Sequence, residues 1–284
     1  MNRWFAMAVP PILLLLSCSR HEVHRYSRES TAMDTYVSVT VYDSEVSPQR
    51  ANALIDSAFT EIRRIEKMMT DYTDTSEVGI INVRAGKDTV TVSKELVALL
   101  KASVSYSEKS NGAFDVTVGP IVKAWDFLSS EPEIPSKSKI RMLRQLVGYR
   151  NILIDSNKVF LQERGMRIDL GAIAKGYAVD RAIEVLKRNG VKNTIVDLGG
   201  NLGIWWEGTH SLESPVAEIL VRHPRKEGKF FGALKVGTSG VSTSGDYQRY
   251  IIKNDVRYAH IIDPRTGKQP RELSSVTMVM SNSG

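Results

Sequence analysis

The stretch RIDLGAIAKGYAVDRAIEVLKRNG, residues 167–190, decides how the middle of this chain folds. Its first residues, through Leu170, are typical of a short buried strand, and Gly171 then allows a turn. The apolar residues that follow recur with helical spacing, which predicts an amphipathic helix. Lys175 falls in the first turn of that helix, where the helix dipole disfavours a positive charge. The position of this lysine, six residues after Asp169, therefore needs an explanation.

Length and composition are those of an ordinary globular protein. The chain has 284 residues, of which 42% are hydrophobic and 25% charged, enough for one large domain or two small ones. It carries 38 Lys and Arg against 32 Asp and Glu, a formal net charge of +6. The basic residues are scattered through mixed-charge stretches such as TEIRRIEK, as on a solvated surface, so we expect no nucleic-acid partner.

The N-terminus has the pattern of a secretion signal. Residues 4–16 form an apolar run that is short for a membrane span, and its two adjacent prolines disfavour a helix docked in the core. The LLSC that closes the run resembles a lipobox, and Cys18 is the only cysteine. We therefore expect a signal peptide at residues 1–17, lipid modification of Cys18 and a polar tether at residues 18–30. The protein would then be a bacterial lipoprotein on the periplasmic or other extracytoplasmic face of a membrane.

The rest of the chain combines strand and helix patterns. Residues 35–43 alternate as in a half-buried strand, and a helix is predicted from Pro48 after the N-cap Ser47. A polar loop is expected over residues 70–86, followed by a second helix capped by Ser93. Further strands are expected at residues 88–92, 151–155, 158–162, 194–198, 202–206, 217–223, 230–236, 249–253 and 256–262. The mixture predicts an α+β fold with largely antiparallel sheets and packed helices.

Standard nucleotide-binding and hydrolase motifs are missing from the sequence. Glycines 171 and 176 flank AIAK, but the lysine precedes the second glycine, so this is not a Walker A loop. GGNLG does not fit the dinucleotide fingerprint, and there is no zinc-binding helix pair or G-x-S-x-G elbow. The turn into the helix still favours an anion site, because free N–H groups at a helix start bind phosphate and Lys175 adds a charge. The alternative is a surface ion pair between Asp169 and Lys175 beside a glycine turn.

Seven motifs, in this order along the chain, resemble those of the ApbE family of flavin transferases. They are MDT from Met33, TDYTDTSEVGIIN, NGAFDVTVGPIVKAW, IDLGAIAKGYAVDRA, VDLGGN, STSGDYQRY and HIIDPRTG from His260. DLGAIAKG and HIIDPRTG are the most specific, and the resemblance runs from about Met33 to the last residue. Taken singly, Met33 would be assigned to the core, AFD to a turn and His260 to the end of a strand.

The resemblance implies an Mg²⁺-dependent enzyme that cleaves the pyrophosphate of FAD. Members of the family transfer the FMN half to a Thr or Ser hydroxyl of a partner flavoprotein and release AMP. By motif, the residues implied to contact FAD are Met33, Tyr72, Ala113, Phe114, Asp115, Asp169, Lys175 and Ile262. The carbonyl of Ala172 is implied to be a metal ligand, and His260 and Asp169 are our candidates for catalytic groups. A pyrophosphate at this helix start would explain the position of Lys175.

Two departures from the family pattern matter. Asp34 stands where many members have glycine, and we expect this to be tolerated. Family members also continue past the position of Gly284 with a segment beginning AD, whose Asp and Thr supply most side-chain metal ligands. We therefore expect this sequence to be part of a longer protein, with an incomplete domain at residues 31–284. Two alternatives stay open: hydrolysis of FAD to FMN and AMP, and a lipoprotein that binds flavin without turnover.

Overall fold

The computed structural model describes residues 23–43, 45–127, 129, 131–207 and 217–281. The predicted signal peptide and Cys18 lie outside the described residues. None of the helices in the described ranges is both long enough and apolar enough to cross a membrane.

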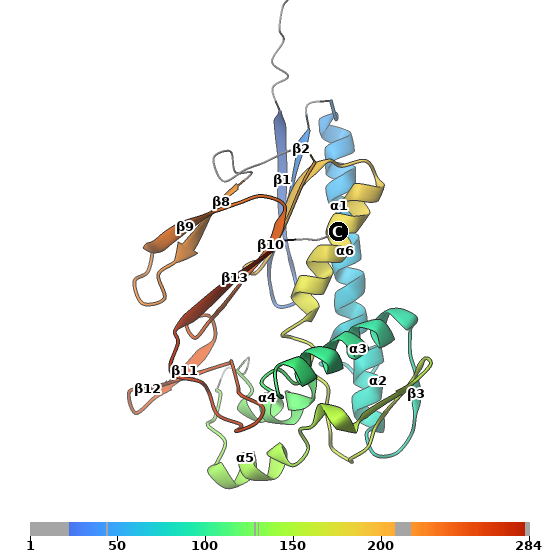
Figure 1. Cartoon of the computed structure of the whole chain (residues 1–284), viewed down its shortest axis with the longest axis vertical. Coiled ribbons are helices and arrows are strands. Elements are labelled where there is room, and N and C mark those ends of the chain that lie inside the picture. The colour runs from blue at the N-terminus through green and yellow to red at the C-terminus, as the bar shows by residue number, and fades with distance from the viewer. Residues whose placement is uncertain (1–22, 44, 128, 130, 208–216, 282–284) are drawn as a thin grey trace, which may run out of the picture.

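A six-stranded antiparallel sheet forms the centre of the fold (Figure 1). Its strand order is β1-β2-β6-β7-β10-β13, and every neighbouring pair is antiparallel. In β2 the alternating residues Val37, Val39 and Val41 are buried, as the sequence pattern predicts. The strands are β1 (His24–Ala32), β2 (Thr35–Asp43), β6 (Asn193–Leu198), β7 (Asn201–Trp206), β10 (Ser239–Gly245) and β13 (Ser275–Ser281).

Two long helices pack on each other and on this sheet. Helix α1 (Pro48–Met69) lies against β1 and β2, and α6 (Ala174–Arg188) lies against β6 and β7. The Oγ of Ser47 accepts a hydrogen bond from the N–H of Arg50 at 3.3 Å, so α1 begins as the sequence predicts. The apolar sides of both helices join the sheet in the main hydrophobic core, which fixes the direction in which α6 begins.

A helical layer lies below α1 and α6 in Figure 1. Its longest helix follows Ser93, whose Oγ accepts from the N–H of Leu96 at 3.1 Å, and ends before Asn111 and Gly112, as predicted. A small antiparallel sheet of order β3-β5-β4 completes the layer and contains the predicted hairpin. The elements are α2 (Glu77–Arg84), α3 (Lys94–Lys109), α4 (Gly119–Trp125), α5 (Lys137–Arg144), β3 (Val90–Thr91), β4 (Ile152–Asp155) and β5 (Lys158–Leu161), with 3₁₀ turns at Val116–Val118 and Tyr149–Asn151.

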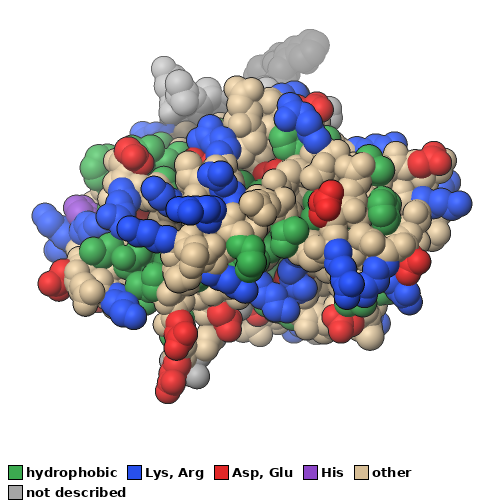
Figure 2. Space-filling view, turned by 90° about the horizontal axis from the view of Figure 1, so that it is seen from below, with side chains coloured by type: hydrophobic (Ala, Val, Ile, Leu, Met, Phe, Trp, Pro, Cys, Tyr) green, Lys and Arg blue, Asp and Glu red, His purple; other side chains and the backbone are tan. Residues whose placement is uncertain are grey.

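Two further hairpins complete the described fold. They are β8 (Ala217–Arg222) with β9 (Phe230–Val236), and β11 (Tyr250–Lys253) with β12 (Val256–Ala259). All four strands agree with the sequence prediction, and the Asn254-Asp255 turn joins β11 to β12 as expected. Seen from the end at which α5 lies, the surface has Lys and Arg side chains with Asp and Glu side chains among them (Figure 2).

The predicted fold class is confirmed, but two local predictions in the middle of the chain are wrong. Residues 70–86 are not a loop throughout, because α2 forms there with Ser76 as its N-cap. Residues 166–170 are not a strand. The backbone of Ile168 is paired instead with a side chain, because the amide of Asn82 accepts from its N–H at 2.7 Å and donates to its carbonyl at 2.9 Å. A side-chain amide thus takes the place of a neighbouring strand.

The predicted tether is also wrong over part of its length. Residues 24–30 belong to β1, which pairs with β2 along all nine of its residues, from His24 opposite Asp43 to Ala32 opposite Thr35. The polar side chains that suggested a tether lie on an edge strand, most of whose residues are exposed. Composition alone therefore did not separate an exposed strand from a linker.

Candidate functional site

The start of α6 is the centre of the candidate site. The carbonyl of Leu170 accepts from the N–H groups of Ile173 at 2.9 Å and Ala174 at 2.8 Å, which closes the turn into the helix. No side chain caps α6, and its first turn contains no acidic residue. The N–H of Ala174 is used in this turn, but no described residue accepts from the N–H groups of Lys175 and Gly176, which are left for solvent or an anion. Lys175 is in this turn, and its Nζ donates to the carbonyl of Gly171 at 3.3 Å.

Asp169 precedes the turn and fixes its shape. Its N–H donates to the carbonyl of Val116 at 2.8 Å, and its Oδ1 accepts from the N–H of Gly171 at 2.7 Å. Burial raises the pKa of Asp169, and the negative charge of Asp71 raises it further. The hydrogen bond from Gly171 and the charges of Arg167 and Lys175 act in the opposite direction. Asp169 and Lys175 are not among the ion pairs formed by the described residues, so the surface ion pair considered as an alternative is not formed.

Lys175 is a partly desolvated cation without a carboxylate at ion-pair distance among the described residues. Burial lowers its pKa below the ordinary range, and the positive charge of Arg249 lowers it further. The carboxylates of Asp169 and Asp34 oppose that shift. A lysine in this environment is stabilised when an anion binds beside it.

His260 follows β12 and is held in one tautomer. The backbone N–H of His260 donates to the carbonyl of Arg249 at 3.0 Å, and the ring Nδ1 lies 3.2 Å from the same oxygen. Because a carbonyl only accepts, Nδ1 carries the proton and Nε2 keeps its lone pair. Burial lowers the pKa of His260, the charges of Arg249 and Lys175 lower it further, and the hydrogen bond to Arg249 opposes them. The ring is therefore neutral near pH 7, and Nε2 can accept a proton.

The turn between β1 and β2 reaches the same region from the sheet. Met33 and Asp34 both have left-handed backbone conformations, with φ of 51° and 57°. The N–H of Met33 donates to Oε1 of Glu66 at 2.6 Å, and Nη2 of Arg249 donates to the carbonyl of Asp34 at 2.8 Å. A left-handed conformation is one that glycine adopts freely and aspartate tolerates, which explains the substitution at Asp34 in physical terms.

Tyr72 lies on the loop before α2, with 68% of its surface exposed. Partial desolvation of its hydroxyl and the charges of Asp34, Asp71 and Asp169 raise its pKa to about 12. Arg167 holds this loop, because its Nε donates to Oδ2 of Asp71 at 2.9 Å. The structure thus brings together one group of sequence-predicted residues: Met33, Tyr72, Asp169, Lys175 and His260.

Asp115 belongs to a second group of predicted residues and is buried in the helical layer. Its Oδ1 accepts from the N–H of Thr117 at 2.8 Å and from the Thr117 hydroxyl at 2.6 Å, and its Oδ2 accepts from the N–H of Tyr149 at 2.9 Å. These bonds hold the 3₁₀ turn next to a cavity of about 420 Å³, which Asp115, Tyr149 and Arg265 help to line.

Ala113 and Phe114, which precede Asp115 in the chain, and Ile262 are more accessible. Ala113 is exposed, while Phe114 and Ile262 are half-buried. The hydrogen bond from Asp169 to Val116 joins the turn that follows Asp115 to the start of α6. The two groups of predicted residues are therefore connected directly through the backbone.

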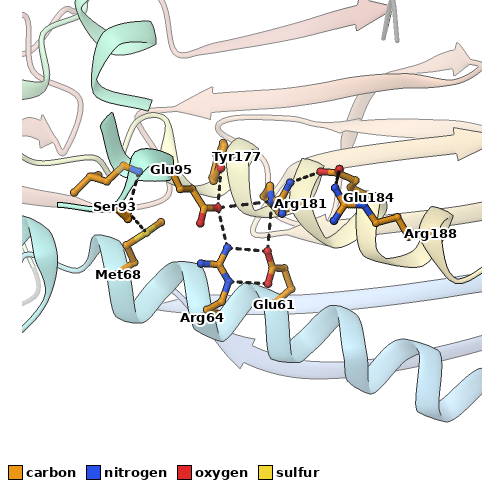
Figure 3. Close-up of polar contacts among 10 residues, drawn as sticks. Glu61, Arg64, Met68, Ser93, Glu95, Tyr177, Arg181, Glu184 and Arg188 are labelled. Atoms are coloured by element: carbon orange, nitrogen blue, oxygen red, sulfur yellow. Dashed lines mark hydrogen bonds and ion pairs between the residues drawn. The ribbon is translucent and has the colours of Figure 1, made fainter. Parts of the chain in front are cut away.

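Ion pairs and hydrogen bonds hold α6 against α1 and α3 (Figure 3). Arg64 donates from Nε to Oε2 of Glu61 at 2.8 Å and from Nη2 to Oε1 of Glu95 at 2.8 Å. From α6, the Tyr177 hydroxyl donates to the same oxygen of Glu95 at 2.8 Å, and Arg181 lies 3.4 Å from Glu61. Hydrogen bonds from Arg64 lower the pKa of both glutamates. This network fixes the helix turn next to Lys175.

Three charged residues of the site were not singled out from the sequence: Asp71, Arg167 and Arg249. All three lie in or beside quoted motifs, since Asp71 precedes Tyr72, Arg167 precedes IDLG and Arg249 is in STSGDYQRY. Membership of a motif was the only signal for them. Their roles depend on contacts between distant segments, such as that of Arg249 with Asp34.

The described residues contain no cluster of three or more His, Cys, Asp or Glu that could hold a metal ion. Mg²⁺ is commonly bound through one or two protein oxygens together with water and substrate phosphates. Ala172, the predicted ligand, is exposed in the turn before α6, and no hydrogen bond from the described residues ends on its carbonyl. A free carbonyl oxygen beside an uncapped helix start is compatible with such a ligand.

Known proteins are similar to this chain in both sequence and fold. The sequence profile of the ApbE family matches residues 33–284. A protein of Klebsiella pneumoniae named FAD:protein FMN transferase is 33% identical over 261 residues, which cover 91% of this chain and 78% of that protein. The crystal structure of the ApbE protein from Thermotoga maritima superposes with a TM-score of 0.81 at 31% identity, covering 90% of this chain and 82% of that one. The flavin transferase ApbE from Vibrio cholerae gives a TM-score of 0.78 at 25% identity, covering 91% and 82%. This chain therefore belongs to the ApbE family.

Proposed function

We propose that this protein is an FAD:protein FMN transferase that binds the pyrophosphate of FAD at the start of α6. The observation that carries the proposal is the combination of an uncapped helix start, a partly desolvated Lys175 and a neutral His260 in one electrostatic environment. The names of the relatives support the reaction. We assign contacts with FAD to Met33, Tyr72, Ala113, Phe114, Asp115, Asp169, Lys175 and Ile262.

The chemical step uses the lone pair of His260. Its Nε2 takes the proton from a Thr or Ser hydroxyl of the acceptor protein. The hydroxyl oxygen then forms a bond to the phosphorus of the FMN half, the bond from this phosphorus to the bridging oxygen breaks, and AMP leaves with that oxygen. Lys175 and the N–H groups of α6 stabilise the charge on the phosphate oxygens. Asp169 keeps the helix start in place through Gly171.

Mg²⁺ is the proposed metal. Bound at the phosphates, it would neutralise charge on their oxygens. Among the described residues, Ala172 is the one that we assign as a ligand, through its carbonyl.

The test is to incubate the protein with FAD, MgCl₂ and a candidate acceptor that carries a Thr or Ser, and to measure AMP and protein-bound flavin fluorescence. AMP together with flavin that stays on the acceptor after denaturation supports transfer. AMP without protein-bound flavin would instead identify an FAD pyrophosphatase. Bound FAD without AMP would identify a flavin-binding protein without turnover.

We also propose that lipid on Cys18 anchors the protein to the extracytoplasmic face of a membrane. The support is the lipobox-like LLSC sequence. Replacement of Cys18 by Ser should release the protein from the membrane fraction of expressing bacteria, whereas unchanged fractionation would contradict lipid anchoring.

A further inference from the structure

The backbone carbonyl of Arg249 orients His260, but its guanidinium has no role in the function proposed above. Arg249 is in the loop between β10 and β11, where its carbonyl accepts from both the N–H and Nδ1 of His260. Its guanidinium donates from Nη2 to the carbonyl of Asp34 at 2.8 Å. An arginine has five N–H donors, and among the described residues only the carbonyl of Asp34 accepts from the guanidinium of Arg249.

Arg249 is set apart because it has neither a carboxylate nor an aromatic ring as a partner among the described residues. Four arginines of the described residues are not exposed, and they are Arg167, Arg181, Arg249 and Arg257. Arg167 pairs with Asp71, Arg181 pairs with glutamates, and Arg257 lies over the ring of Tyr250 at 3.8 Å. Arg249 forms no ion pair with any described residue. A partly buried charge without a counter-ion is unfavourable in the free protein, and an anionic ligand would remove that cost.

The contacts of Arg249 with Asp34 and His260 place it in the electrostatic environment of Lys175. Its charge lowers the pKa of Lys175 and of His260, which places all three groups within electrostatic range. The carboxylates of Asp169 and Asp34 raise the pKa of Lys175, against the effect of Arg249. Neither carboxylate forms an ion pair with Lys175 or Arg249. Two cations from different segments therefore share the electrostatic environment of the uncapped start of α6.

We propose that Arg249 is a phosphate-binding residue, whose free guanidinium N–H groups hold the FAD pyrophosphate opposite Lys175. This inference rests on the proposed binding of FAD. The two cations are suited to different tasks, because a guanidinium offers a planar fork that matches two phosphate oxygens, while an ammonium acts as a point charge. By binding the phosphate and the turn of Asp34 at once, Arg249 also couples the β1–β2 turn to the ligand.

The experiment compares Arg249→Gln and Arg249→Lys with the wild-type protein and with Arg257→Gln, a control that removes another partly buried arginine from the neighbouring hairpin. FAD affinity is titrated by flavin fluorescence at several salt concentrations, ADP is titrated by calorimetry, and the melting temperature is measured without ligand. No acceptor and no turnover are required. A protein that binds FAD through Arg249 but transfers nothing would keep this inference and refute the transferase proposal.

We expect Arg249→Gln to weaken FAD and ADP about tenfold or more and to reduce the salt dependence of FAD binding. Its melting temperature without ligand should match the wild type, and Arg249→Lys should recover part of the affinity. Arg257→Gln should bind FAD as the wild type does. FAD affinity within twofold of wild type in Arg249→Gln would overturn the inference. So would a loss accompanied by a lower melting temperature and unchanged salt dependence, since that result means a structural role.

Discussion

Replacement of Lys175 by Met should weaken FAD binding without destabilising the free protein. Methionine keeps much of the length of the side chain but removes the charge. The lost interaction is a charge-assisted contact with phosphate, worth about 1.5–3 kcal/mol, so the dissociation constant should rise about ten- to a hundredfold. The effect on the free protein follows from the lowered pKa of Lys175, because burial disfavours its charged form in the folded state.

The sign of the stability effect can be worked out from that shift. A lysine with a lowered pKa in the folded state binds protons more weakly there than in the unfolded chain, so its charge costs stability at neutral pH. This cost disappears as the pH rises toward the ordinary lysine pKa. Lys175→Met should therefore melt at the same temperature as the wild type or higher. Function and stability would change in opposite directions, as is common for binding sites.

The assay is FAD titration by fluorescence alongside thermal unfolding without ligand. The control is Lys94→Met, which removes an exposed lysine from the first turn of α3, outside the site. The control should leave FAD affinity unchanged. If Lys175→Met binds FAD as tightly as the control does, the start of α6 is not the pyrophosphate site. If it binds more weakly but also melts well below the wild type, the lost affinity has a structural origin.

Three further predictions concern the base, the helical layer and the network around α6. His260→Gln should lower FMN transfer by about 10²- to 10⁴-fold while FAD still binds. Because the pKa of His260 is lowered, the activity of the wild type should decline only below pH 6.5. A decline that begins above pH 6.5 would contradict a His260 that is neutral at pH 7. Gly79→Ala should lower the free energy of urea unfolding by at least about 2 kcal/mol, because the new Cβ would lie 1.8 Å from the carbonyl oxygen of Thr73. An unchanged free energy of unfolding would show that the backbone moves easily to relieve this contact. Tyr177→Phe should cost about 1–2 kcal/mol in the same assay, since it removes the hydroxyl bonded to Glu95, and no loss would mean that this hydrogen bond adds nothing to stability.

Local patterns predicted much of the secondary structure. The helix from Pro48 and the helix after Ser93 follow from N-caps and helical spacing, which act within a few residues. The β11–β12 hairpin follows from Asn254 and Asp255, which adopt the left-handed conformations that a tight turn requires. These features needed no information about distant segments.

The wrong predictions concern segments whose structure depends on distant partners. The extended segment around Ile168 is paired by the amide of Asn82, far away in sequence, so an apolar pattern did not distinguish it from a strand. The polar residues from His24 form a strand because β2 is available to pair with them. In both cases the partner, not the local composition, decides the conformation.

The candidate site also combines features that the local sequence predicts with features that depend on distant segments. Lys175 was conspicuous in the sequence because a cation at a helix start is unfavourable without an anion. Its distance of six residues from Asp169 was also visible in the sequence, but its relation to His260 came only from the family resemblance. The part played by Arg249 required the fold, since its contacts join the β1–β2 turn to the end of β12.

The most direct test of the account is an experimental structure of this protein with FAD bound. We expect the pyrophosphate to lie at the free N–H groups in the first turn of α6, beside Lys175 and within reach of His260 Nε2. FAD bound elsewhere, with its phosphates away from the start of α6, would contradict the central claim.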